Sequence, residues 1–202
     1  MIAEVLEKLY TVEEYFKQEE RANYKSEFRN GKIVPKLRDA GGSFAHNKIG
    51  LNIAVALSNI LKDDLYDVIN SDHAIHIPKP NHFVYADVSV VKGEPQLYND
   101  GNQGILNPTV IFEVASDSTE KYDRYGKFKK YKTIPTFQEY VLVEQDVPIV
   151  EVYLKNKDVW QSSTYIGLEE TVLLQSINCS LKMTDIYKKI KGLLNPQTIM
   201  DL

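Results

Sequence analysis

The sequence predicts a mixed β-sheet flanked by helices, in the α/β or α+β class. Short apolar or alternating runs that are typical of strands come between segments with helical periodicity. Their order along the chain is a helix, a hairpin, a long helix, several strands, a helix and further strands, as expected for a sheet covered by helices. Nothing resembles a linker or an internal repeat. The 202 residues are therefore expected to form a single domain, 1–202.

The first elements are expected to be a short helix and a β-hairpin. Thr11 and Glu14 have the spacing of a capping box at the start of a helix over 11–20. In the following stretch, 24–36, the pair Asn30-Gly31 stands between two short extended runs. Both residues tolerate a positive φ, so this pair predicts a tight hairpin turn.

Later elements follow from apolar periodicity. A long helix is predicted over 44–62, where apolar residues recur near the helical period. Strands are expected at 67–70, 73–78, 84–91, 109–115, 136–144 and 147–155. The segment 92–108 is turn-rich and is expected to be irregular. A helix over 120–133, short antiparallel strands over 158–183 and a closing helix over 184–193 complete the prediction.

Composition narrows the functional class. The net charge is −4 and the pI is about 5.6, which disfavours a protein that coats nucleic acid non-specifically. Cys179 is the single cysteine, so no intramolecular disulfide can form, as is usual in a reducing compartment. The first 20 residues are too charged for a signal peptide, and no apolar run approaches the roughly 20 residues of a membrane span. We therefore expect a cytoplasmic protein with no membrane association.

Two acidic residues lie inside apolar, strand-like runs. Asp87 interrupts VYADVSVV (84–91), and Glu113 interrupts TVIFEVA (109–115). An unpaired ionised carboxylate in an apolar sheet is costly, because desolvation penalises its charge. If the two strands are neighbours, the carboxylates could converge and share a hard cation such as Mg²⁺.

A basic segment follows the second of these runs. EKYDRYGKFKKYK (120–132) holds six positive and two negative charges, in a protein of net charge −4. Phe128 and Tyr131 are three residues apart and could face the core. Lys127, one turn before Tyr131, would then lie within reach of the carboxylates.

The stretch ADVSVV…NPTVIFEVASDSTEKYDRYGKFKKYKTIPTFQEYVLVEQD resembles the Uma-two family of predicted restriction endonucleases, in the PD-(D/E)XK nuclease superfamily. The resemblance covers most of the chain, including the hairpin, and is densest over 86–146. It implies a restriction-endonuclease-like fold with a mixed central sheet flanked by helices, preceded by an N-terminal helix and a β-hairpin.

The family pattern assigns roles to particular residues. It makes Asp87 and Glu113 the acidic residues that bind metal. Ala86 replaces the usual proline before the aspartate, and Ala115 replaces the lysine expected two positions after the glutamate. The resemblance implies that Lys127, in KFKKY, is a migrated substitute for that lysine.

The resemblance also implies a wider set of site residues. Lys129 and Lys130 are the next candidates after Lys127. Glu27, in the hairpin, matches an acidic position of the family and could be a further metal ligand. His46 matches a recurrent family position, and with Arg124 it could line the site.

Each of these residues also has a purely structural interpretation. Asp87 and Glu113 could be buried carboxylates satisfied by backbone amides or an arginine. Lys127 could pair with Asp123, four residues earlier, on a solvated helix face. Glu27 could be a charge on a strand face, and the histidine near the start of the long helix could simply pack there.

A zinc site is a weaker interpretation of the sequence. His73, His76 and His82 lie close together in the chain, but the first two would point to opposite faces of a strand. No cysteine is near them, whereas zinc needs three or four converging ligands.

The favoured hypothesis is an endodeoxyribonuclease that depends on Mg²⁺ or Mn²⁺, with DNA as substrate and Asp87, Glu113 and Lys127 as its catalytic residues. A homodimer is expected, because cutting both strands needs two sites. The alternative is a catalytically silent member of the fold that binds nucleic acid or protein, as Ala115 and the acidic net charge suggest. A third option is a self-associating structural protein with a relic site.

Overall fold

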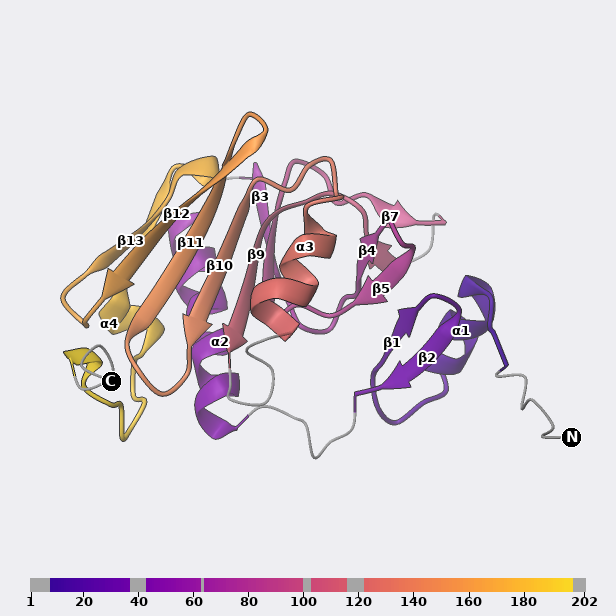
Figure 1. Ribbon diagram of the computed structural model, residues 1–202, viewed down its shortest axis with the longest axis horizontal. Helices are drawn as coiled ribbons and strands as arrows, with labels where there is room; N and C mark the ends of the chain where they lie inside the picture. Colours follow the sequence, from indigo (N-terminus) through magenta and orange to yellow (C-terminus); the bar gives the residue numbers. More distant parts are fainter. Residues whose placement is uncertain (1–7, 37–42, 63, 100–102, 116–121, 198–202) are drawn as a thin grey trace, which may run out of the picture.

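The computed structural model describes residues 8–36, 43–62, 64–99, 103–115 and 122–197. Two six-stranded sheets and a two-stranded hairpin form the framework (Figure 1). The mixed α/β architecture agrees with the predicted fold class. No helix in the described part of the chain is long and apolar enough to cross a membrane.

The first sheet has the strand order β2-β1-β5-β4-β8-β7. Its strands are β1 (Ser26–Arg29), β2 (Lys32–Pro35), β4 (Ile75–Ile77), β5 (His82–Val84), β7 (Leu97–Tyr98) and β8 (Gln103–Ile105). The predicted hairpin turn is present, with φ of 51° at Asn30 and 80° at Gly31. Helix α1 (Val12–Glu19) packs beside this hairpin, and its capping box between Thr11 and Glu14 is formed as predicted.

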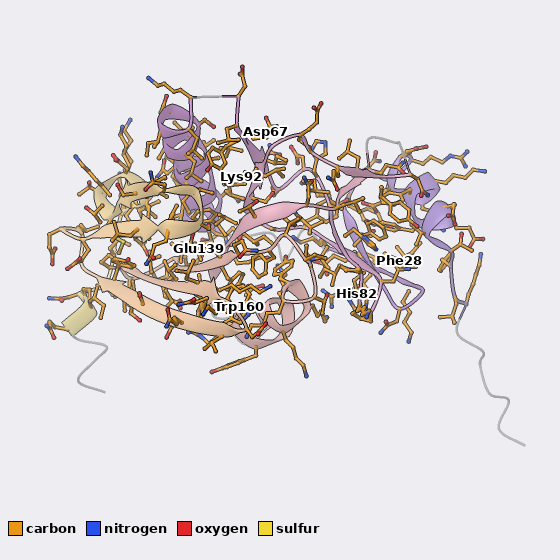
Figure 2. The ribbon with its side chains drawn as sticks, turned by 90° about the horizontal axis from the view of Figure 1, so that it is seen from above. Phe28, Asp67, His82, Lys92, Glu139 and Trp160 are labelled. Carbon is orange, nitrogen blue, oxygen red and sulfur yellow. The ribbon has the colours of Figure 1, made fainter. Side chains whose placement is uncertain are left out.

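The second sheet has the order β12-β11-β10-β9-β6-β3. Its strands are β3 (Tyr66–Asn70), β6 (Val88–Lys92), β9 (Pro108–Ala115), β10 (Glu139–Glu144), β11 (Ile149–Asn156) and β12 (Val159–Ile166). β9 is parallel to β10 and antiparallel to β6, so this sheet is mixed. Figure 2 shows Asp67, Lys92, Glu139 and Trp160 following one another across it in strand order.

Helices cover opposite faces of the second sheet (Figure 1). Ser43 caps α2 (Phe44–Ile60), whose buried residues pack against alternate residues of β6 and β9. The intervening residues of β9 face α3 (Phe128–Tyr131) on the other side. β9 is buried on both faces over its whole length, and any polar side chain on it therefore needs a partner inside the protein.

The predicted strand 84–91 is wrong as a single element. β5 ends at Val84 in the first sheet and β6 begins at Val88 in the second, with Asp87 in the bend between them. Both pieces are buried, so a continuous apolar run could not reveal where the chain passes from one sheet to the other. The consequence is that Asp87 lies at the junction of the two sheets.

Three other elements differ from the prediction. The helix expected over 120–133 is a π-helix, η2 (Tyr122–Lys127), followed by the single α-turn of α3, while residues 120–121 lie outside the described part. The closing helix is also one turn, α4 (Met183–Ile186), because Lys189 takes a φ of 61° that a helix does not allow. β7 and β8 are too short for periodicity to detect in the segment expected to be irregular.

The region 158–183 forms short antiparallel strands, as predicted. β12 pairs with β11, and β13 (Thr171–Leu174) pairs with β14 (Cys179–Lys182). A 3₁₀ turn, η3 (Gln175–Ile177), joins the last two strands.

Candidate active site

Glu113 is a buried carboxylate in the middle of β9, with only 1% of its surface exposed. Its side chain lies on the face that α3 covers. Lys127 Nζ donates to Oε2 at 2.9 Å, and the hydroxyl of Tyr131 donates to Oε1 at 2.7 Å. Both carboxylate oxygens are therefore held by side chains from the segment that follows β9.

Lys127 is the last residue of the π-helix and is 6% exposed. Besides Glu113, its ammonium group lies 3.0 Å from Oδ1 of the buried Asp123. The pairing with Asp123 that the structural interpretation expected is present, but it lies on a buried face instead of a solvated one. Lys127 thus faces two carboxylates inside the protein, a costly arrangement unless both charges are compensated.

Ala115 lies on β9 two residues after Glu113. Positions 113 and 115 lie on the same face of β9, because side chains alternate along a strand. Ala115 is fully buried and packs in one cluster with Phe128 and Tyr131 of α3. Its small side chain allows the helix to approach closely, and Lys127 brings its ammonium group to Glu113 from there.

Asp87 lies next to Glu113 across the junction of the sheets. Its Oδ2 accepts a hydrogen bond of 2.7 Å from the backbone N–H of Val114, the residue after Glu113. Its Oδ1 lies 3.0 Å from Nε2 of His46, which donates because an ionised carboxylate can only accept. His46 is in the first turn of α2, where Ser43 accepts from its backbone N–H. The structure therefore brings Asp87, Glu113, Lys127 and His46 together.

Among the described residues, carboxyl groups outnumber ammonium groups around Glu113. Burial, opposed by Lys127 and helped by the nearby Asp123 and Asp87, raises the pKa of Glu113 to about 8. Burial alone would lower the pKa of Lys127, but Glu113, Asp123 and Asp87 outweigh it and raise that pKa well above its usual value. Three carboxyl groups of the described residues thus lie around the Lys127 ammonium group, an environment that favours an additional cation.

The pKa of Asp87 is shifted in the opposite direction from that of Glu113. Burial would raise the pKa of Asp87, but His46, Lys127 and the Val114 amide together lower it below the usual range. Two neighbouring carboxyl groups with pKa values moved in opposite directions are characteristic of sites that perform acid–base or metal chemistry.

The remaining predicted residues lie around this centre or apart from it. Glu27 on β1 is 2% exposed and is bound by the guanidinium group of Arg29, with its Oε2 2.7 Å from Nε. Its charge acts on Lys127, so Glu27 is near the site. Lys130 is half-buried and lies close enough to Arg29 and Lys127 for their charges to act on it, whereas Lys129 is exposed.

Arg124 is not directed at Glu113. Its guanidinium group pairs with Glu144 at 2.9 Å and with Glu151, at the β10–β11 side of the π-helix. Arg124 was expected to line the site. Its guanidinium group instead holds the π-helix from the side of β10 and β11.

Sequence reasoning missed two participants, Asp123 as a buried partner and Tyr131 as a donor. Their spacing was available: residues 123, 127 and 131 are four apart and can share one helical face. Tyr131 was assigned only to the core, although a buried tyrosine hydroxyl usually needs a polar partner.

Asp87 and Glu113 fit a hard divalent cation by their chemistry. Mg²⁺ prefers oxygen ligands and commonly takes one or two carboxylates, with water completing its shell. Among the described residues, no group of three His, Cys, Asp or Glu side chains is arranged to hold a metal. Asp87 and Glu113 are the described side chains that would hold such a cation, and water would fill other positions of its shell.

A family model described as "Uma2: Putative restriction endonuclease" matches residues 12–184. The chain belongs to this family. Among curated proteins, two from Synechocystis that are described as uncharacterized are similar to this chain. The protein sll1609 is 37% identical over 151 residues, covering 75% of this chain and 84% of the relative. The protein slr1290 is 33% identical over 177 residues, covering 87% and 90%.

A solved structure shares the fold. It is the crystal structure of a protein from Anabaena variabilis described as a putative nuclease belonging to DUF820. The two chains superpose with a TM-score of 0.65 over 86% of this chain and 93% of the other, at 17% sequence identity. This likeness shows that the Uma2 chain described here has the fold of that protein.

Proposed function

We propose that this Uma2 protein is a metal-dependent nuclease that hydrolyses phosphodiester bonds in DNA. One observation carries the proposal. The backbone N–H of Val114, the residue after Glu113, donates to Asp87, and the Lys127 ammonium group lies 2.9 Å from Glu113. An acidic pair with an adjacent lysine is the minimal set for metal-assisted hydrolysis of a phosphodiester. The membership in a family of predicted restriction endonucleases supports the same assignment.

In this proposal Asp87 and Glu113 hold Mg²⁺ or Mn²⁺. When bound, the metal supplies Lewis acidity and lowers the pKa of a coordinated water. The protein supplies orientation. His46 and the Val114 amide fix the Asp87 carboxylate, and Tyr131 fixes that of Glu113.

Lys127 is assigned to the reacting phosphate. In this proposal its ammonium group, which contacts Glu113 and Asp123, exchanges one of these contacts for a phosphate oxygen or the attacking water when substrate binds. A fixed positive charge in a water-poor site stabilises the charge that develops on the phosphate. Burial of Lys127 strengthens this effect, because the effective dielectric is lower than in water.

Residues around the centre are assigned to substrate binding. Lys129, which is exposed, and Lys130, which is half-buried, are assigned to contacts with substrate phosphates. Glu27 either contributes an outer ligand or holds Arg29 at the rim of the site, as its bond to that residue suggests. We further propose a homodimer, because cutting both strands of a duplex requires two such centres.

Nicking of supercoiled plasmid DNA tests the proposal. The parent protein is expected to nick DNA with Mg²⁺ and to be inactive with a chelator. Asp87→Asn and Glu113→Gln should abolish nicking, whereas Asp67→Asn, at an exposed carboxylate on β3, should retain it. An Asp87→Asn protein that is folded and as active as the parent would refute the assignment.

A second candidate function is DNA binding without cleavage. It is favoured by the fact that both oxygens of Asp87 and of Glu113 already have protein partners. Under this alternative the parent binds DNA equally with metal or with chelator and leaves the plasmid intact under both conditions.

A further inference from the structure

The segment that carries Lys127 has an unusual backbone. Tyr122–Lys127 is π-helical, and α3 continues from it as an α-turn. π-Helices are rare, mostly occur as single turns joined to α-helices, and are enriched at functional sites. A less favourable backbone of this kind persists when contacts on both sides determine it.

One set of contacts holds the end of the segment that contains Arg124. The Arg124 guanidinium group pairs with Glu144, at the end of β10, and with Glu151 on β11. The Tyr153 hydroxyl donates to the second oxygen of Glu151 at 2.6 Å and so fixes that carboxylate. We call Arg124, Glu144 and Glu151 the arginine clamp.

A second set of contacts holds the other end. The ring of Phe128 stacks on Tyr140 of β10, with centroids 4.8 Å apart, and meets Tyr153 at the same distance. Tyr131 is fully buried and donates to Glu113. α3 is therefore fixed to the sheet by contacts of its own with Tyr140 and Glu113, and it shares Tyr153 with the arginine clamp.

These two sets of contacts give Arg124 a positioning role. We propose that the arginine clamp holds the π-helical register that places Lys127 against Glu113. A π-helix has more residues per turn than an α-helix, which turns by about 100° per residue. A change from π- to α-helix would therefore rotate Arg124 away from its carboxylates while α3 stays in place. Conversely, breaking the arginine clamp leaves this end of the segment with the hydrogen bond of 2.9 Å from the Tyr140 hydroxyl to the Asp123 carbonyl. The segment then relaxes toward an α-helix, which changes the direction of Lys127.

This inference rests on the proposed function only for its catalytic consequence. The position of Lys127 can be observed without any activity, by proton–nitrogen correlation NMR of lysine ammonium groups. A buried ammonium group held by carboxylates exchanges its protons slowly enough to be detected, and its absence in Lys127→Met assigns the signal. In the parent protein this signal is expected to be present.

Arg124→Met is expected to abolish or strongly shift the Lys127 signal, and the pair Glu144→Gln/Glu151→Gln should have the same effect. Arg124→Lys, which keeps the charge without the two-pronged geometry, should restore part of the signal. Lys132→Met is the matched control. It removes a cation that lies 4.0 Å from the Phe128 ring centroid, on the same segment but outside the arginine clamp, and it should leave the signal unchanged.

Kinetics provides the second readout. If the parent cleaves DNA, Arg124→Met should lower kcat by roughly 10²-fold with little change in KM, as expected for a displaced catalytic group. An unchanged Lys127 signal in folded Arg124→Met would overturn the inference even if the parent is a nuclease. If the signal is present in the parent and lost in Arg124→Met, but the parent never cleaves DNA, the arginine clamp is supported and the proposed function is rejected.

Discussion

Two glutamates are buried in adjacent parallel strands of this protein, Glu113 on β9 and Glu139 on β10, and their surroundings differ. Glu139, labelled in Figure 2, accepts from the backbone N–H groups of Gln175 and Ser176 at 3.1 and 3.2 Å, and from the Ser176 hydroxyl at 2.6 Å. All of these donors are neutral. Glu113 is instead surrounded by a lysine, a tyrosine and two further carboxylates.

The difference separates a structural carboxylate from a candidate catalytic one. Glu139 stabilises the turn η3 and joins the C-terminal hairpin to the second sheet, and nothing in its contacts requires a further ligand. Glu113, Asp123 and Asp87 lie around the ammonium group of Lys127, so that carboxyl groups outnumber ammonium groups among the described residues of this centre. Burial raises the pKa of both glutamates, so the shift alone does not distinguish them. The nature of their partners does.

The largest expected effect is on DNA cleavage. Glu113→Gln keeps the shape of the side chain but removes the charge needed for metal binding, and should lower the cleavage rate by at least roughly 10³-fold. Glu139→Gln should stay within a few-fold of the parent, while its free energy of unfolding falls by about 1–3 kcal/mol. Initial rates and urea unfolding measure the two quantities. Equal rate losses in both variants would remove the distinction.

Relocation of the lysine is expected to have the next largest effect. Lys127→Met should lower kcat by roughly 10²-fold, because a fixed charge near the reacting phosphate is lost. Adding Ala115→Lys to this variant returns an ammonium group from the same face of β9 and should recover part of the rate. The single Ala115→Lys variant, which would crowd two lysines together, is the control. No recovery in a folded double variant would argue against Lys127 as the substitute for a strand lysine.

The dependence of stability on pH should differ between the parent and Glu113→Gln. The pKa of Glu113 is about 8 in the folded protein, above its usual 4.5, so the folded state binds the additional proton between these values. Its contribution to stability is present below pH 4.5 and is lost as the pH rises through about 8. In chelator, the parent should therefore lose stability relative to Glu113→Gln between pH 5 and 8, as measured by urea unfolding. Parallel curves for the two proteins would show that Glu113 is ionised throughout.

The smallest effect is expected at the exposed rim. Lys129→Ala and Lys130→Ala should each reduce the slope of log affinity against log salt by about 1, because each removes one phosphate contact. Lys182→Ala, at an exposed position on β14, provides the comparison. Fluorescence anisotropy with labelled duplex DNA in chelator gives these slopes. An identical change in the slope for Lys182→Ala would indicate general electrostatic attraction instead of a defined contact.

Local chemistry predicted much of the fold. The Asn30-Gly31 turn and the Thr11 capping box depend on a few neighbouring residues, and both formed as expected. The break at Asp87 and the π-helix did not follow from the sequence. Both pieces of the broken strand are equally buried, and the π-helical register depends on contacts with β10 and β11 that lie far away in the chain.

The candidate site was predictable to a similar extent. The unusual positions of Asp87 and Glu113 in apolar runs indicated a shared site, and the contacts through Val114 agree with it. Glu139 lies in a similar run, TFQEYVLVE, and sequence alone did not separate it from Glu113. The choice of Lys127 came from the family resemblance, and its buried pairing with both Glu113 and Asp123 required the structure.

Calorimetric titration with Mn²⁺ tests most directly the claim that Asp87 and Glu113 share a metal. The parent protein, Asp87→Ala, Glu113→Gln and Glu139→Gln would be compared after circular dichroism has shown that each is folded. The account predicts binding in the parent and in Glu139→Gln, and its loss in both Asp87→Ala and Glu113→Gln. Mn²⁺ binding that survives both of these substitutions would contradict it.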